Sequence, residues 1–306
     1  MRCLLFLCAL TLSTVGLWSA DAPPATTPTT TVATPPQPGY GFTVGANRIY
    51  AYSLKQTVAW NSAGDDLTYT STLTWKFLLT VAESTPERAV LNATILRVQA
   101  THEGPGSKRL VDSSAKIGDD GSDDALLGHL LALNGAVLSV VVTPSTGHVS
   151  EVRGGEAIIA RINQRAPAAT PGDPPPLDAA AKAAFSSEAL SRIWSQLLTL
   201  PSATPVRVPL GPPLNGEIER TWQGPTYTLR LPAGADRLSA TLVGDPTPVS
   251  AVLSELTGSG GTSIAEGLPG AGKGELTFAL TFVALTQPVL QRHTLAWELT
   301  PLLTPR

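Results

Sequence analysis

The sequence predicts an α+β fold in which a large curved antiparallel sheet packs on two or three helices. Alternating strand patterns occupy both ends of the chain, and helical patterns occur only near its middle. Most of the predicted strands follow one another through short turns, which is typical of antiparallel pairing. Together these observations favour an antiparallel sheet of about ten strands with helices in the centre of the chain.

Residues 1–20 have the pattern of a secretory signal peptide. Arg2 supplies a minimal positive region, and residues 4–17 form an apolar core that is short for a membrane span. Small residues follow this core, so cleavage is expected after Ala20 or Ala22. An uncleaved anchor is the alternative interpretation. A cleaved signal predicts an exported protein, periplasmic or extracellular, with no transmembrane span in the mature chain.

Composition restricts the class of protein further. The 306 residues carry a formal net charge of −3 and have no basic cluster, which excludes a nucleic-acid surface. Cys3 and Cys8 lie inside the signal, so the mature chain is expected to have no disulfide. Residues 21–39 form a Pro/Thr-rich spacer that we expect to be disordered. Residues 40–306 form a single β-rich domain, with the proline-rich stretch 166–176 as the place where it would divide.

The N-terminal part of the domain predicts three strands in an antiparallel meander. Residues 48–54 alternate apolar and polar side chains, residues 67–81 form a long strand, and residues 89–100 follow after a turn. A shorter strand is expected within residues 109–117. The long strand has large apolar side chains at every second position, and these therefore share one face.

The middle of the chain predicts a helix, a hairpin and a second helix. Acidic residues followed by spaced leucines indicate a helix over residues 123–131. The β-branched residues 137–142 and the segment 148–152 indicate two strands joined by a turn. Helical spacing resumes at residues 156–162, so we expect helix faces to pack on the sheet here.

The remainder of the chain predicts one more helix and then further strands. The helix lies in the second half of residues 177–200, with Ser186 as its N-cap. The glycine-rich residues 258–274 are expected to form a loop. The predicted strands on either side of that loop cover residues 217–222, 227–231, 237–243, 249–256, 276–285 and 293–299.

Short motifs that resemble ligand sites are interpreted as ordinary structure. Residues 267–274 nearly match a phosphate-binding loop, but Gly274 replaces the required Ser or Thr, so a flexible hairpin loop is expected. The acidic residues 119–124 lack the spacing of a calcium loop and suit the cap of the following helix. The four histidines are not at metal-ligand spacing. We therefore expect no metal and no cofactor.

Large apolar side chains on one face of the predicted strands are the candidate ligand-binding residues. A curved sheet with such a face encloses either a solid core or an apolar cavity. No catalytic residue is assigned, since no nucleophile elbow of the form Gly-x-Ser-x-Gly is present. The ligand-binding candidates are Trp75, Phe77, Leu79, Phe278, Leu280, Phe282 and Trp297.

Two stretches carry a resemblance to known proteins. The first is Trp75-Lys76-Phe77 with the strand that follows it, and the second runs from Val140 to Gly154 and contains Gly-x-Val-x-x-Val-x-Gly. They resemble a family of uncharacterised exported bacterial β-rich domains. The order of elements is also similar to lipoprotein-carrier half-barrels, in which a long antiparallel sheet curls around helices and holds acyl chains. This resemblance implies a half-barrel-like architecture and no catalytic residues.

The sequence therefore predicts an exported, non-enzymatic protein that binds an apolar or lipidic ligand in the concave face of its sheet. Its partner would be a hydrophobic small molecule or a lipid. One alternative is a structural or interaction module of the cell envelope, with a solid core and an envelope protein as partner. A second alternative is a hydrolase with a dispersed site that uses one of the four histidines, because a Ser/His/Asp triad meets only in space. Replacement of His148 or His129 with loss of hydrolytic activity would be needed to favour it.

Overall fold

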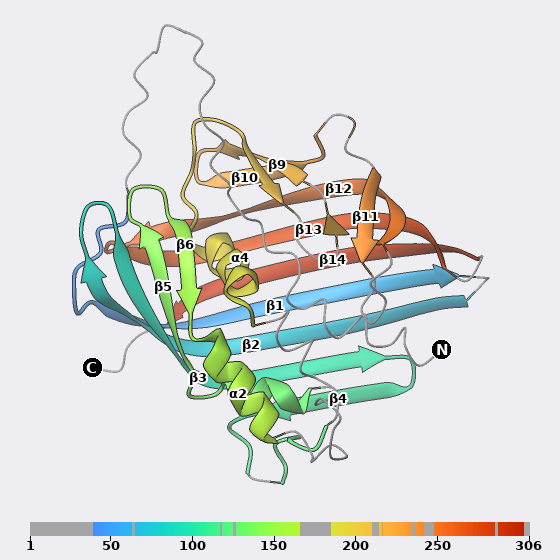
Figure 1. The fold of residues 1–306 in the computed structure, drawn as a ribbon, viewed down its shortest axis with the longest axis horizontal. Coiled ribbons are helices and arrows are strands. Elements are labelled where there is room, and N and C mark those ends of the chain that lie inside the picture. The colour runs from blue at the N-terminus through green and yellow to red at the C-terminus, as the bar shows by residue number, and fades with distance from the viewer. Residues whose placement is uncertain are drawn as a thin grey trace, which may run out of the picture.

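The computed structural model contains one large antiparallel sheet. Fourteen strands form it, and along its main path they follow the order β6-β5-β3-β2-β1-β14-β13-β12-β10-β9-β7 (Figure 1). Strands β4, β8 and β11 attach to β3, β11 and β12 beside this path. The structure describes residues 39–62, 65–116, 118–124, 127–165, 185–209, 214–215, 217–232, 234, 237–241, 248–284 and 287–302.

Six long strands form the centre of the sheet. Most of them alternate buried and less buried side chains, because neighbouring residues of a strand point to opposite faces. β1 pairs with β2 on one side and with β14 on the other, so the two terminal parts of the chain meet in the middle of the sheet. The six strands are β1 (Asn47–Ser62), β2 (Asp65–Ser84), β3 (Ala89–Gly104), β12 (Pro248–Ala265), β13 (Leu268–Ala284) and β14 (Gln287–Leu302).

Shorter strands extend the sheet at both ends. On one side β3 pairs with β4 and β5, and β5 pairs with β6, which confirms the predicted central hairpin. On the other side β12 pairs with β10 and β11, and β9 and β7 follow β10. The bounds are β4 (Ser107–Asp112), β5 (Val137–Thr143), β6 (His148–Arg153), β7 (Val206–Pro209), β8 (Leu214–Asn215), β9 (Glu217–Gln223), β10 (Thr226–Arg230) and β11 (Arg237–Thr241).

The predicted α+β class was wrong, and the protein is mainly β. In the described residues, fourteen strands are accompanied by three short helical elements: the 3-10 helix η2 (Gly128–Leu133), α2 (Gly155–Arg165) and α4 (Ser187–Leu198). Within the described part of the helix predicted over residues 123–131, only the start of η2 is helical, and so short a segment forms too few helical hydrogen bonds to offset nucleation. The half-barrel packed on helices that the resemblance implied is therefore not the class observed.

The capping prediction for α4 is confirmed. The Ser186 side chain accepts a hydrogen bond of 3.1 Å from the Ala189 amide, which satisfies one free donor of the first helical turn. Glu188 lies in the same turn and accepts a hydrogen bond from Arg192 at 2.8 Å. The start of this helix is therefore set by the local sequence.

The glycine-rich segment 258–274 forms paired parts of β12 and β13, so the predicted loop was wrong. The turn between these strands consists of Glu266 and Gly267 alone, with φ values of 53° and 75°. Positive φ at both positions is typical of the tight turn that joins two twisted antiparallel strands. Other glycines leave room for bulky neighbours, as at Gly274, where an added Cβ would lie 2.3 Å from Trp297 Nε1.

The sheet curls, so strands that are far apart in its order approach one another. Helix α4 contacts β6 at one end of the order and also β12 and β13 near the other. Tyr52 of β1 and Tyr227 of β10 interact electrostatically, although three strands separate them in the sheet. Figure 1 shows α2 and α4 on the same face of the sheet. We call this the inner face.

The chain before β1 connects two turns at one rim of the curled sheet. The Tyr40 amide donates a hydrogen bond of 2.9 Å to the carbonyl of Pro144, in the β5–β6 turn. Gly267, in the β12–β13 turn, lies so close to Gly41 that an added Cβ would be 2.4 Å from the Gly41 carbonyl oxygen. Residues 39–42 therefore join turns that belong to opposite parts of the sheet.

The inner face carries two apolar clusters. The first, the helix-covered cluster, combines strand residues such as Phe77 with residues of η2, α2 and α4 such as Trp194. The second, the strand-only cluster, draws its buried members from β7, β9, β10, β12, β13 and β14. These members are Val208, Ile218, Tyr227, Leu229, Ala251, Leu253, Leu276, Phe278, Leu280, Phe282, Val289 and Leu295.

Parts of the predicted organisation lie outside the described residues. They include the signal peptide at 1–20, all but the last residue of the spacer at 21–39, and the proline-rich stretch 166–176. Strands from both sides of residues 166–176 belong to the same sheet. The division of the chain into one or two domains stays a prediction.

Candidate functional site

The structure divides the seven predicted ligand-binding residues between the two clusters. Each of them is buried, with an exposed fraction of 8% or less. Their role in binding a ligand stays a prediction. The helix-covered cluster contains Trp75, Phe77, Leu79 and Trp297. The strand-only cluster contains Phe278, Leu280 and Phe282.

Aromatic side chains pack densely in the helix-covered cluster. Trp194 of α4 meets Phe77 edge to face, with 5.4 Å between ring centroids. Phe77 in turn stacks on Tyr50 at 5.3 Å, and Tyr52 lies against Trp75 of the next strand at 5.7 Å. Such offset and edge-to-face contacts are those of a packed protein core.

The strand-only cluster forms a continuous apolar row across the sheet. Leu229 pairs with Gly258, Gly258 with Leu276, and Leu276 with Leu295. An added Cβ at Gly258 would lie 2.9 Å and 3.1 Å from the Cδ1 atoms of Leu229 and Leu276, so the glycine lets these side chains approach each other. The partly buried side chains at the margin of the cluster are Trp60, Val206, Trp222, Leu231 and Leu256.

Polar side chains gather where the two clusters meet, and we call Tyr52, Arg220, Trp222, Tyr227 and Trp297 the inner polar cluster. Trp297 forms a side-chain hydrogen bond with Tyr227. The Arg220 guanidinium carbon lies 4.5 Å from the centroid of the Tyr227 ring and 5.9 Å from that of Trp222. Trp222 meets Tyr227 edge to face at 5.0 Å. Burial raises the pKa of the Tyr227 and Tyr52 hydroxyls.

The sequence analysis did not single out Arg220, whose exposed fraction is only 3%. Ile218, Arg220 and Trp222 alternate along β9 and so share a face. That alternation was the available signal, because it places a guanidinium among inward-facing apolar residues. Arginine is almost never fully buried unless it is paired, and this makes the position informative.

Two buried histidines also lie on the inner face. The His293 ring stacks on Phe278 at 4.7 Å, and its Nε2 lies 3.0 Å from Gln291 Oε1. Burial lowers the pKa of His293 to about 4. His102 Nδ1 lies 2.8 Å from Ser71 Oγ on the neighbouring strand, and burial is the main cause that lowers the pKa of His102.

The hydrolase alternative stays a prediction. Ser71 and His102 form a serine–histidine contact, but their exposed fractions are only 3% and 5%. The histidines that the sequence analysis named lie elsewhere, with His129 in η2 and His148 at the start of β6. The sequence therefore did not anticipate which histidine contacts a serine hydroxyl.

A groove with a volume of about 940 Å³ crosses β1, β14, β13, β12 and β10 over the glycine-rich part of the sheet. Its lining includes the exposed side chains of Lys55, Lys273, Glu275 and Glu298, which alternate with inward-facing residues on their strands. The inward-facing Tyr227, Trp297 and Leu299 also line the groove, so its walls combine residues of both faces, and the charges among its exposed residues are of both signs. This mixture gives the groove no preference for one sign of charge.

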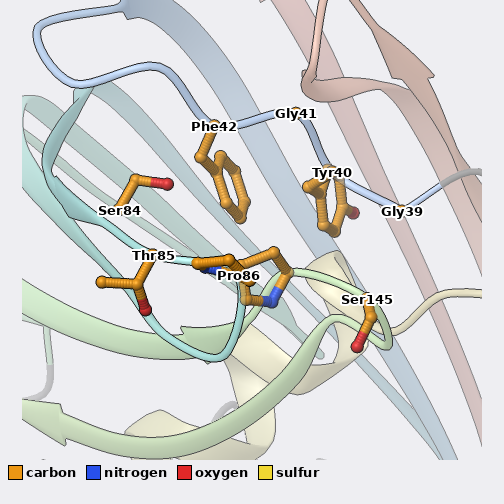
Figure 2. Close-up of a pocket in the computed structure, with 9 residues that line it drawn as sticks. Gly39, Tyr40, Gly41, Phe42, Ser84, Thr85, Pro86 and Ser145 are labelled. Atoms are coloured by element: carbon orange, nitrogen blue, oxygen red, sulfur yellow. The ribbon is translucent and has the colours of Figure 1, made fainter.

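A smaller hollow of about 490 Å³ lies beside residues 39–42 (Figure 2). Tyr40 and Phe42 stack there with 4.9 Å between their ring centroids. Figure 2 shows their rings beside Pro86 and the turn that carries Ser145. The hollow sits where the N-terminal segment joins the rim, and its walls carry no charged side chain among the residues that line it.

The structure also describes the acidic segment that was considered as a calcium loop. Asp124 accepts hydrogen bonds from the Leu127 amide at 2.8 Å and from Arg109 at 3.1 Å, and Asp120 accepts one from the Ser122 amide. Within the described ranges, no group of three or more His, Cys, Asp or Glu side chains is placed to hold a metal ion. The described carboxylates therefore stabilise turns.

None of the helices that the structure describes has the length and apolar character needed to cross a membrane.

No protein-family model and no curated protein match the chain. The resemblance to exported bacterial domains and lipoprotein carriers therefore stays a prediction.

Distant similarity to solved structures exists. Lipovitellin, described for its lipid–protein interactions, has 9% identity and a TM-score of 0.35, over 87% of this chain and 26% of that chain. DynF of the dynemicin biosynthesis pathway of Micromonospora chersina has 12% identity and a TM-score of 0.22, over 95% and 97%. Pseudomonas aeruginosa OpdQ has 7% identity and a TM-score of 0.20, over 85% and 100%. The chain spans about a quarter of the length of lipovitellin, and none of these TM-scores assigns a fold family or an activity.

Proposed function

We propose that this protein is an exported, non-enzymatic binding protein that holds a lipid-like ligand on the inner face of its sheet, at the strand-only cluster. The signal pattern of residues 1–20 supports export. The observation that carries the binding proposal is the make-up of the strand-only cluster. Its buried apolar side chains all come from strands, whereas helices pack on the other half of the same face.

The geometry suits a molecule with an apolar tail and a polar end. Burying one CH₂ group contributes about 0.8 kcal/mol, so a tail of a dozen carbons along the strand-only cluster would supply most of the affinity. The inner polar cluster lies at one border of this apolar row and offers hydrogen-bonding groups for the polar end. The partly buried tryptophans Trp60 and Trp222 lie at the margin, where a ligand would meet the cluster first.

Native mass spectrometry of the chain purified from its own host tests the proposal. We expect a bound mass of lipid size that is released on denaturation, and saturable uptake of a fluorescent fatty acid by the delipidated protein. A bare polypeptide mass together with no uptake would reject lipid binding. That result would favour the envelope interaction module, whose partners cross-linking would then identify.

Adjacent residues of β13 provide a matched pair of variants for this assay. Leu280 is buried in the strand-only cluster, and Thr281 is exposed on the opposite face. Leu280→Asn should weaken fatty-acid uptake by about tenfold or more, because burial of a leucine side chain contributes about 1.5–3 kcal/mol. Thr281→Asn should leave uptake unchanged. Equal uptake by both variants, at equal folded fractions measured by circular dichroism, would show that the fatty acid does not bind on the inner face.

A further inference from the structure

Arg220 is a buried cation with no acidic partner among the residues that the structure describes. Its Nε and Nη2 atoms are buried and have no hydrogen-bond partner within the described part of the chain. Its sheet neighbours are apolar, since Arg220 pairs with Leu229 on one side and with Val206 on the other. The charged side chain therefore projects into the strand-only cluster.

The aromatic rings around Arg220 offset only part of its desolvation. A guanidinium over an aromatic face gains less than the desolvation of a buried, unpaired charge costs. Tyr227, at 4.5 Å, is the closer of the two rings. Buried guanidinium groups are ordinarily paired with carboxylate or phosphate, which match their planar fork of donors. The described surroundings of Arg220 supply these aromatic contacts and no carboxylate partner.

Other unpaired polar atoms lie in the same region. Trp222 Nε1, the Tyr52 hydroxyl and Thr262 Oγ1 are buried and find no hydrogen-bond partner in the ranges that the structure describes. Trp222 and Tyr52 both interact with Tyr227, and Thr262 follows two residues after the strand partner of Tyr227, Gly260. Buried polar groups are ordinarily hydrogen-bonded. Several unpaired groups around one buried cation therefore indicate that the polar group of a ligand is their common partner.

We propose that Arg220 binds the anionic head group, a carboxylate or a phosphate, of a single-chain amphiphile whose tail lies along the strand-only cluster. The proposal rests on the function proposed above and names the chemistry of its ligand. The tail would follow the row that begins beside Arg220 at Leu229 and continues through Leu276 to Leu295. The Nε and Nη2 donors of Arg220 would form two parallel charge-assisted hydrogen bonds to the head group.

Calorimetric titration of the delipidated full chain with dodecanoate, dodecyl phosphate and dodecanol separates the head group from the tail. We expect at least one of the two anions to bind about tenfold or more tightly than the alcohol, since hydrogen bonds to a charged group contribute about 1.5–3 kcal/mol. Arg220→Met should abolish this preference, so that the variant binds neither anion more tightly than dodecanol. Arg207→Met is the matched control, because Arg207 is an exposed arginine on the neighbouring strand β7 and should not affect binding.

The outcomes separate this proposal from the proposed function. Equal affinity for all three ligands in the natural protein would overturn the role of Arg220 and leave lipid binding standing. No binding of any of them would overturn both. If Arg220→Met does not fold, the comparison of anions with alcohol in the natural protein still decides, and Arg220→Lys, which retains the charge without the fork, should give an intermediate preference. The better of the two anions identifies the head group as carboxylate or phosphate.

Discussion

Replacing Gly147 with alanine should lower the free energy of unfolding by about 3–5 kcal/mol, at the upper end of single-substitution effects. Gly147 lies in the β5–β6 turn with φ of +69°, and an added Cβ would lie 1.8 Å from the carbonyl oxygen of Leu198, the last residue of α4. Backbone atoms would have to move to relieve this contact. The neighbouring hydrogen bond from the Leu200 amide to the Thr146 carbonyl, at 2.9 Å, would be lost with it.

Urea unfolding followed by tryptophan fluorescence measures this effect, and Gly135→Ala is its control. Gly135 has nearly the same φ, +72°, but an added Cβ there would meet nothing within 4 Å. The control should therefore lose only the cost of a left-handed backbone, about 1–2 kcal/mol. Equal losses in the two variants would show that the docking of α4 on the turn does not limit stability.

Acid should destabilise the protein through His293. Burial lowers the folded-state pKa of this residue from 6.5 to about 4, so between these values the unfolded state binds more protons than the folded state. Stability is then fully present above about pH 6.5 and is lost as the pH falls toward 4. Each pKa unit corresponds to about 1.4 kcal/mol, so His293 alone should account for about 3 kcal/mol across this interval.

Urea unfolding between pH 4 and pH 7.5 checks this prediction with His293→Gln. Glutamine stays neutral, so the variant should show a clearly shallower loss of stability on acidification. Its stability near pH 7 should be about 1 kcal/mol lower, because the stack on Phe278 is removed. His148→Gln, at a partly exposed site at the start of β6, is the matched control for replacing a histidine with glutamine. An unchanged slope in His293→Gln would assign the acid sensitivity to other groups.

Local patterns predicted the elements of this fold more accurately than its class. Alternation located the central strands and the β5–β6 hairpin, and the Ser186 cap located the start of α4. Glycine content misled the analysis at residues 258–274, because glycine there serves neighbouring side chains such as Trp297 and not a flexible loop. With these residues in strands and the first predicted helix reduced to η2, the class became mainly β.

The candidate site was predictable only in part. Parity placed Phe278, Leu280 and Phe282 together, since residues two apart on a strand share a face. Alternation along the strands could not show that they belong to a different cluster from Trp75 and Phe77, which lie on the same inner face but are covered by helix residues. The separation depends on where α4 crosses the curled sheet, which no local pattern encodes.

The sequence by itself determined the strands, the faces that their side chains share, the cap of α4 and the overall charge, because these depend on residues close together in the chain. Only the tertiary structure decided that β1 pairs with β14, that Tyr52 approaches Tyr227, and that Arg220 lies buried against aromatic rings without an acidic partner among the described residues. The pairing of β1 with β14 and the approach of Tyr52 to Tyr227 join residues more than a hundred positions apart. They arise from the curl of the whole sheet, which sums small twists over many strands.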